Sequence, residues 1–278
     1  MIALVLALGC SLAYGCADFL GGLGARKAHV LRTVMIAAPA SLVVELVLWP
    51  LLGASFSAGA LAWGAASGVA SAAAFALLYR TLAIGPMNVL SPVTALVSAA
   101  LPVSVGLLQG EHLAAAALIG LPLALVAVVL VSAGSGAGSA RPSRTALLLA
   151  FGAGAAISLQ LVFLHQAPAD SGVAPLIVGR TVSSALTLSA AALMWRRLGP
   201  ERPAYGMSAA AGALDSVANL LFLLAARSGD LTVVAVITAL YPAATVLLAR
   251  GVLHERIGRG QLAGLGAAAL AVSLLALS

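Results

Sequence analysis

The sequence predicts an all-α membrane protein, with ten transmembrane helices arranged as two inverted five-helix repeats. Hydrophobic residues make up 62% of the 278 positions and charged residues only 8%, whereas a soluble domain carries about a quarter charged residues. Apolar segments of about 20 residues, the length that crosses a bilayer, recur along the chain. A stretch in the first half of the chain also recurs in the second half. Together these observations exclude a soluble domain.

The apolar segments divide the chain into two groups of five spans. We expect spans at 2–22, 32–52, 59–79, 86–108, 114–133, 146–165, 173–195, 207–226, 231–251 and 260–277. The break at 134–145 is rich in Gly and Ser, a composition typical of a flexible linker. We therefore assign residues 1–133 to the first repeat and residues 146–278 to the second.

Residues 77–113 align with residues 221–257 without a gap. Apolar matches are expected by chance in so hydrophobic a chain, but glycines and polar residues coincide as well. We interpret the following pairs as structural markers of the repeat: Gly85 with Gly229, Thr94 with Thr238, Glu111 with Glu255 and, farther along, Gly120 with Gly264. Because five is an odd number of spans, the second repeat would cross the membrane in the opposite sense. Inverted repeats of this kind place a substrate site near the bilayer midplane, between the halves.

The net charge of +6 indicates membrane orientation rather than nucleic-acid binding, because nearly all basic residues stand at span ends. Of the 14 lysines and arginines, all but Arg180 and Arg227 fall at the connections between spans 1–2, 3–4, 5–6, 7–8 and 9–10. These connections share one side of the membrane. The positive-inside rule places that side in the cytoplasm and both termini outside.

Two polar residues in the eighth span predict a surface that faces a cavity. Asp215 and Asn219 are four residues apart and therefore share one helical face. The repeat relates them to Ser71 and Phe75 in the third span, which we expect to face the same cavity from the other half. The alternative for Asp215 is an internal salt bridge to Arg180, and the two roles are compatible.

Further residues extend the predicted substrate cavity. Arg180 in the seventh span cannot lose its proton, and it would either hold an anionic group such as a carboxylate or reach to the interface. Glu45 and Gln160 are polar residues inside the second and sixth spans. Tyr79 and Tyr241 either line the cavity or belong to the interfacial aromatic belt.

Asp18 lies deep in the first span and is the predicted proton-coupling residue. A charged side chain at the bilayer centre costs about 2.5–3.5 kcal/mol on insertion scales, so an acidic residue there indicates a function. A carboxylate that takes up and releases a proton would couple transport to a proton gradient. The alternative is an interfacial residue or a helix-end partner of Arg26, close to Gly21 and Gly22.

Each repeat has a proline in its fourth span and a glutamate at the end of that span, and the two glutamates are repeat mates. Pro92 and Pro242 free backbone carbonyls, which can line a cavity or let a helix bend during alternating access. A static kink is equally compatible with these prolines. Glu111 and Glu255 each stand just ahead of the next helix, whose N-terminal dipole a carboxylate stabilises.

Several motifs carry a resemblance to a known family. They are Leu90–Leu96, Gly110-Glu111 and Gly120 in the first repeat, Thr238–Pro242, Glu255 and Gly264 in the second, the segment Tyr14–Phe19, and the arginines Arg32 and Arg180. Together they resemble the EamA-type ten-helix members of the drug/metabolite transporter superfamily over essentially the whole chain. The resemblance implies cytoplasmic termini, in contrast to the charge count.

The residues and the resemblance predict a secondary transporter that moves a small organic metabolite or drug by alternating access, with proton coupling or exchange. The chain has no nucleotide-binding motif, so ATP would not drive it directly, and we expect no cofactor and no metal. The expected partners are a small-molecule substrate, the lipid bilayer and protons, but no nucleic acid. We expect a multi-pass protein of the cell (plasma or inner) membrane. The sequence does not determine its oligomeric state, and a monomer is one alternative.

Two other classes of function are considered. One is a non-transporting membrane scaffold or receptor subunit, against which the repeat and the paired polar faces argue. The other is an integral-membrane enzyme, which would need convergent acids, a metal-binding set or a nucleophile–base pair. The chain shows no HExxH motif and no acid cluster, so we do not expect an enzyme.

Overall fold

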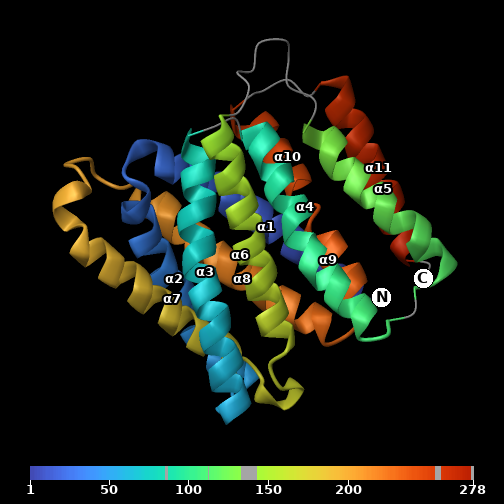
Figure 1. The fold of residues 1–278 in the computed structure, drawn as a ribbon, viewed down its shortest axis with the longest axis horizontal. Coiled ribbons are helices and arrows are strands. Elements are labelled where there is room, and N and C mark those ends of the chain that lie inside the picture. Colours follow the sequence, from blue (N-terminus) through green and yellow to red (C-terminus); the bar gives the residue numbers. More distant parts are fainter. Residues whose placement is uncertain (85–86, 112, 133–142, 254–257, 277–278) are drawn as a thin grey trace.

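The computed structural model describes residues 1–84, 87–111, 113–132, 143–253 and 258–276 (Figure 1). Within these ranges the regular structure is almost entirely helical, which confirms the predicted all-α class. The helices are α1 (Ile2–Lys27), α2 (Val30–Leu52), α3 (Ala58–Ile84), α4 (Met87–Leu108), α5 (Ala115–Ser132), α6 (Arg144–His165), α7 (Ala174–Leu193), α8 (Tyr205–Ala226), α9 (Leu231–Thr238), α10 (Tyr241–Leu253) and α11 (Arg259–Ala276), with short 3-10 helices η1 (Ala169–Ser171) and η2 (Trp195–Arg197).

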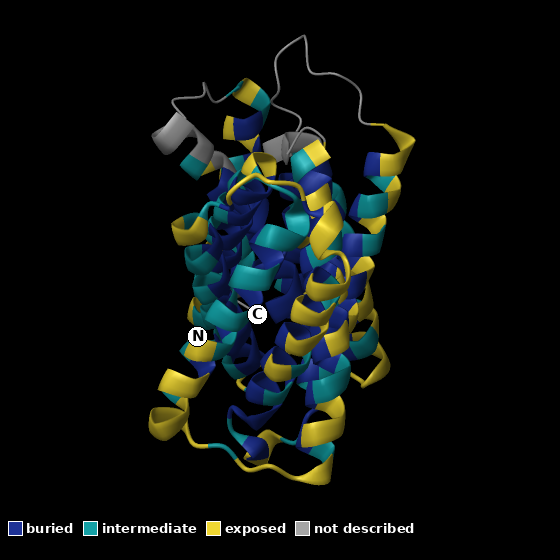
Figure 2. Cartoon of the chain, turned by 90° about the vertical axis from the view of Figure 1, so that its left-hand side faces the viewer, coloured by how far each residue is buried: buried dark blue, intermediate teal, exposed yellow. Residues whose placement is uncertain are grey.

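The helices have the length and the surface of a multi-pass membrane protein. α1–α3 and α6–α8 are long and apolar enough to cross a bilayer, and shorter apolar helices cover 93–108, 115–130, 231–245 and 259–275. Large apolar side chains lie on the outside of the bundle; Val47 is 66% exposed and Leu118 is 59% exposed. In Figure 2 the buried residues gather along the centre and the exposed ones at the periphery. The exposed apolar surface is the part that contacts lipid.

The ninth expected span, 231–251, is two helices rather than one. α9 ends at Thr238 and α10 begins at Tyr241, with a short turn between them. Pro242 explains the break, because proline has no N–H to donate to the carbonyl of Thr238. It instead occupies the first turn of α10, where a missing N–H costs little. The ninth span is therefore interrupted at the proline where the sequence allowed a bend or a static kink.

Most major helix contacts join the two halves of the chain, and each has a counterpart in which the halves exchange places. α1 packs on α8 as α6 packs on α3, and α3 packs on α7 as α8 packs on α2. α4 packs on α6 as α10 packs on α1, while α5 pairs with α11 and α2 with α7. In Figure 1 the α5–α11 pair lies at one edge of the bundle and the α2–α7 pair at the opposite edge. A rotation that exchanges two halves would produce this pattern, although the boundaries of the two repeats remain a prediction.

The contact between α3 and α7 depends on glycine. A Cβ added at Gly68 would overlap the backbone of Gly179, and one added at Gly64 would press against Pro175. Small residues let helices approach this closely in lipid, where close packing replaces the hydrophobic effect. The contact also brings Arg180, which follows Gly179, against α3.

One end of the bundle is tied together by contacts between the α2–α3 and α6–α7 connections. Ala54 and Gly172 form an isolated antiparallel bridge, and the amide of Val173 donates to the carbonyl of Gly53 at 3.0 Å. Arg227 Nη1 donates to the carbonyl of Gly172 at 3.0 Å. Arg227, one of the two basic residues outside the charge pattern, is therefore held by a loop.

Glu111 caps a helix of the other half rather than the helix that follows it. Its Oε1 accepts the N–H of Leu231 at 2.6 Å, and its Oε2 accepts that of Thr232 at 3.0 Å. Asp230, at the N-cap position of α9, makes no side-chain capping bond. The expectation that Glu111 caps the next helix, α5, is therefore wrong. Glu255 lies outside the described residues, so its predicted role is untouched.

Candidate functional site

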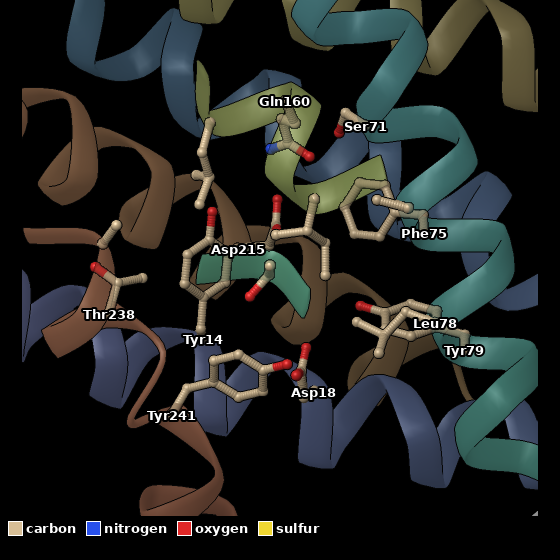
Figure 3. Close-up of a pocket in the computed structure, with 15 residues that line it drawn as sticks. Tyr14, Asp18, Ser71, Phe75, Leu78, Tyr79, Gln160, Asp215, Thr238 and Tyr241 are labelled. Carbon is tan, nitrogen blue, oxygen red and sulfur yellow. The ribbon is translucent and has the colours of Figure 1, made fainter. Parts of the chain in front are cut away.

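A cavity lies within the bundle (Figure 3), and its empty space, including any that opens to solvent, is about 550 Å³. Its wall is built by α1, α3, α4, α6, α8, α9 and α10, and thus by helices from both halves of the chain. The structure brings the following predicted residues together on this wall: Asp18, Ser71, Phe75, Tyr79, Gln160, Asp215 and Tyr241.

Asp215 on α8 forms an ion pair with Arg180 on α7. Arg180 Nη2 lies 2.6 Å from Asp215 Oδ2, and the two side chains are 3% and 13% exposed, respectively. The two alternatives considered for Asp215, a cavity wall and a salt bridge, thus coexist. Because the pair is nearly dry, removing one partner would leave the other charge buried and uncompensated.

Ser71 and Phe75 contact the same guanidinium from α3. Arg180 Nη1 donates to Ser71 Oγ at 2.8 Å, and the guanidinium carbon lies 5.7 Å from the centre of the Phe75 ring. Arg180 therefore points into the bundle and does not reach to the membrane interface. Arg180 thus connects Ser71 on α3 with Asp215 on α8, two residues that the repeat relates.

Asn219 lies one turn after Asp215 but faces a second, smaller cavity. Its Nδ2 donates to the backbone carbonyl of Asp215 at 2.8 Å, and its Oδ1 accepts from Gln160 Nε2 at 2.6 Å. The smaller cavity, with about 180 Å³ of empty space including any that opens to solvent, is also lined by Arg180. Asn219 and Arg180 therefore stand behind the wall of the main cavity. Ser71 and Gln160 line both cavities and form a polar partition between them.

Asp18 faces the main cavity from α1 and is only 6% exposed. Among the described residues, none forms a hydrogen bond or an ion pair with its carboxylate. Arg26, the helix-end partner considered from the sequence, donates instead to the carbonyl of Leu82 at 3.3 Å. Asp18 is thus a cavity carboxylate without a counter-ion in the described part of the chain.

Aromatic rings line the cavity in two pairs. The rings of Tyr14 and Tyr241 have their centres 6.4 Å apart, and those of Phe75 and Tyr79 have theirs 5.6 Å apart. Tyr79 and Tyr241 are buried, so they belong to the cavity and not to an interfacial belt. Figure 3 shows Asp18 between Tyr241 on one side and Leu78 and Tyr79 on the other.

Sequence reasoning missed Tyr14 and Thr238 as cavity residues. Tyr14 stands four residues before Asp18, so the spacing that related Asp215 to Asn219 could have found it. Thr238 was noticed only as a repeat match, and its place beside the α9–α10 break could not be foreseen. Glu45 is not on the cavity wall; it accepts a hydrogen bond from Ser216 at 2.6 Å and joins α2 to α8.

The remaining predicted positions lie in the scaffold. Pro92 falls within α4 and Pro242 in the first turn of α10. A Cβ added at Gly120 would lie 3.0 Å from Leu275 Cγ of α11, so this glycine lets α5 and α11 approach. Gly264 is buried within α11.

Comparison with known proteins adds the family. Residues 144–277 match the model of the EamA-like transporter family. The chain carries an EamA-like transporter domain. This EamA-like domain contains α6–α11 and so contributes Gln160, Asp215 and Tyr241 to the cavity wall. The family indicates a membrane transporter of the drug/metabolite superfamily.

The fold of the EamA-like domain and of the residues before it also has a counterpart among solved structures. A crystal structure described only as that of a protein superposes with a TM-score of 0.77 at 15% sequence identity, covering 99% of this chain and 96% of that chain. At this level of identity the likeness concerns the fold alone. No curated protein matches the chain significantly.

Proposed function

We propose that the protein is a secondary transporter that moves a small organic metabolite or drug by alternating access through the cavity between its two halves. The observation that carries this proposal is the position of the charged residues. Asp18 comes from the first half, whereas Asp215 and its partner Arg180 come from the second. A substrate that contacts both carboxylates would therefore contact both halves, whose relative movement would change the side from which the cavity is open.

The repeat supports this mechanism. The paired helix contacts fit two five-span units, residues 1–133 and 146–278, that exchange under a pseudo-twofold rotation. Two such units can adopt two equivalent arrangements, one open to each side of the membrane. The α9–α10 break at Pro242 supplies a place where one wall of the cavity can bend without breaking further backbone hydrogen bonds.

Asp18 is the proposed coupling residue. A carboxylate held away from water and from counter-ions is costly until a positive charge neutralises it. Either a proton or a cationic substrate would neutralise Asp18, so binding of the proton would oppose binding of the cationic substrate. Such competition is the requirement for coupling the substrate to a proton gradient or to exchange.

The charge pattern favours a cytoplasmic location for the end of the bundle that carries the α3–α4, α5–α6 and α7–α8 connections. Its two exceptions have other roles: Arg180 pairs with Asp215, and Arg227 binds the α6–α7 connection. On this basis we propose termini outside the cell membrane, against the habit of the family. A single chain contains the whole cavity, so a monomer would suffice.

Uptake into proteoliposomes tests this function. A panel of labelled amino acids, nucleosides, sugars and organic cations is presented with and without a pH gradient. We expect gradient-dependent uptake of at least one class, abolished by Asp18→Asn while binding of a neutral ligand is retained. The matched control is Asp230→Asn, because Asp230 is exposed and makes no side-chain capping bond. Absence of flux for every class would favour the scaffold or receptor alternative.

A further inference from the structure

We propose that the cavity selects an organic cation, an amine or ammonium group carried on a flat apolar body, with the positive charge placed at Asp18. This inference names the substrate class of the same cavity and rests on the proposed transport function. It comes from the charge balance of the cavity, from its aromatic walls and from one buried hydroxyl group without a partner.

The described charges around the cavity are not balanced. Asp215 is compensated by Arg180 at 2.6 Å. Asp18 has no such partner, and the nearest basic side chains along the chain are engaged elsewhere. Arg26 donates to the carbonyl of Leu82, and Arg32 donates to the carbonyls of Leu198 and Gly199. The cavity therefore has an uncompensated acidic group, which favours a positively charged ligand over a neutral or negative one.

The aromatic pairs add affinity for the same kind of ligand. Tyr14 and Tyr241 come from α1 and α10, and Phe75 and Tyr79 from α3, so rings stand on opposite walls. The faces of aromatic rings carry negative potential and attract cations at short range. Their large apolar surface also favours a flat ring in the ligand.

Tyr14 supplies an independent sign of a ligand. Its side chain is 9% exposed and lines the cavity, and its hydroxyl group has no hydrogen-bond partner among the described residues. A buried hydroxyl without a partner is unfavourable unless something else occupies the site. Tyr14 and Asp18 share one face of α1, so a polar group held at Asp18 lies within reach of this hydroxyl.

An anionic substrate is the opposing possibility, because Arg180 is close by. However, the guanidinium already contacts Asp215 and Ser71, and it lines the smaller cavity rather than the main one. A carboxylate ligand would have to displace Asp215 and would leave two acidic groups uncompensated. Arg180 therefore holds a carboxylate of the protein, that of Asp215, more favourably than it would hold a carboxylate of the substrate.

Equilibrium binding to the purified full-length protein in detergent tests the inference with three ligands of similar shape. The cation is 1-methyl-4-phenylpyridinium, the neutral analogue is 4-phenylpyridine at pH 7.5, and the anion is biphenyl-4-carboxylate. In calorimetry we expect the protein to bind the cation at least about tenfold more tightly than the neutral analogue. The anion should bind most weakly. Equal or tighter binding of the anion, or no binding of the cation, would overturn the inference.

Variants assign the effect to the proposed residues. Asp18→Asn should weaken binding of the cation at least about tenfold and leave binding of the neutral analogue nearly unchanged. Tyr14→Phe should weaken binding of ligands that carry a hydrogen-bonding substituent. Asp230→Asn is the control and should change neither. If Asp18→Asn does not fold, the ligand series on the native protein still decides the matter. Transport of a non-cationic solute without cation binding would refute this inference and leave the transport function standing.

Discussion

Arg180 Nη2 and Asp215 Oδ2 are 2.6 Å apart, and this ion pair stands where the two cavities meet. Asp215 lines the larger cavity, Arg180 lines the smaller one, and Ser71 reaches both. The pair therefore fixes the polar partition at the centre of the bundle. A substrate that entered the larger cavity would contact only the acidic member of the pair.

Removing one member of this pair should destabilise the protein more than removing both. Asp215→Asn leaves Arg180 buried without a counter-ion and should lower the free energy of unfolding by about 3–5 kcal/mol. Arg180→Gln should cost less, because a carboxyl group can take up a proton whereas a guanidinium cannot lose one. Denaturant titration in detergent micelles measures these differences.

The double variant Asp215→Asn/Arg180→Gln is the control for this pair. Both charges are then absent, so most of the stability lost by Asp215→Asn should return. A double variant as unstable as the sum of the two single variants would show that the charges do not interact, contrary to the geometry.

Glu111 should stabilise α9 across the two halves. Glu111→Ala removes both acceptors from the amides of Leu231 and Thr232, and we expect a loss of about 1–2 kcal/mol in the free energy of unfolding. Hydrogen exchange at these amides should accelerate more than exchange elsewhere in the bundle. Glu201→Ala, at an exposed position of the α7–α8 connection, should have little effect. Unchanged exchange in α9 would contradict the assignment of the cap.

Gly68 should tolerate no side chain, whereas Gly206 should. A Cβ at Gly68 would overlap the backbone of Gly179, but one at Gly206 meets nothing within 4 Å. We expect Gly68→Ala to lower the free energy of unfolding by about 1–3 kcal/mol. Gly206→Ala should be neutral or stabilise the helix by up to about 1 kcal/mol. Equal effects of the two substitutions in thermal unfolding would contradict the close packing of α3 on α7.

The orientation can be read with reporters at two positions. Alkaline phosphatase is active only outside the cytoplasm, and a fluorescent protein exported unfolded stays dark there. With the termini outside, phosphatase fused after residue 278 should be active, and the fluorescent protein inserted at 134–145 should fluoresce. The opposite pattern would support the family habit and refute the charge count.

The sequence predicted the helical membrane fold and much of the cavity wall, because both depend on local patterns. Hydropathy located the spans, and the four-residue spacing of Asp215 and Asn219 with its repeat mates led to Ser71 and Phe75. The same spacing would have related Tyr14 to Asp18. Side-chain direction was less predictable, since Asn219 bonds Gln160 and turns toward the smaller cavity.

What the sequence did not predict depends on contacts between distant segments. Glu111 was expected to cap α5, but α9 approaches it from the other half of the chain and offers two free amides. Pro242 was recognised, yet periodicity alone could not distinguish a kinked helix from two helices separated by a turn. In both cases tertiary packing decided between arrangements that were locally similar.

The central claim is that the cavity opens in turn to each side of the membrane, and cysteine accessibility tests it most directly. Ser98 lines the cavity, so Ser98→Cys in a background of Cys10→Ala and Cys16→Ala places one thiol there. We predict that a charged, membrane-impermeant thiosulfonate labels this thiol both in right-side-out and in inside-out vesicles, and that a transported solute changes both rates. Labelling from one side alone, unaffected by any solute that the protein binds, would contradict alternating access.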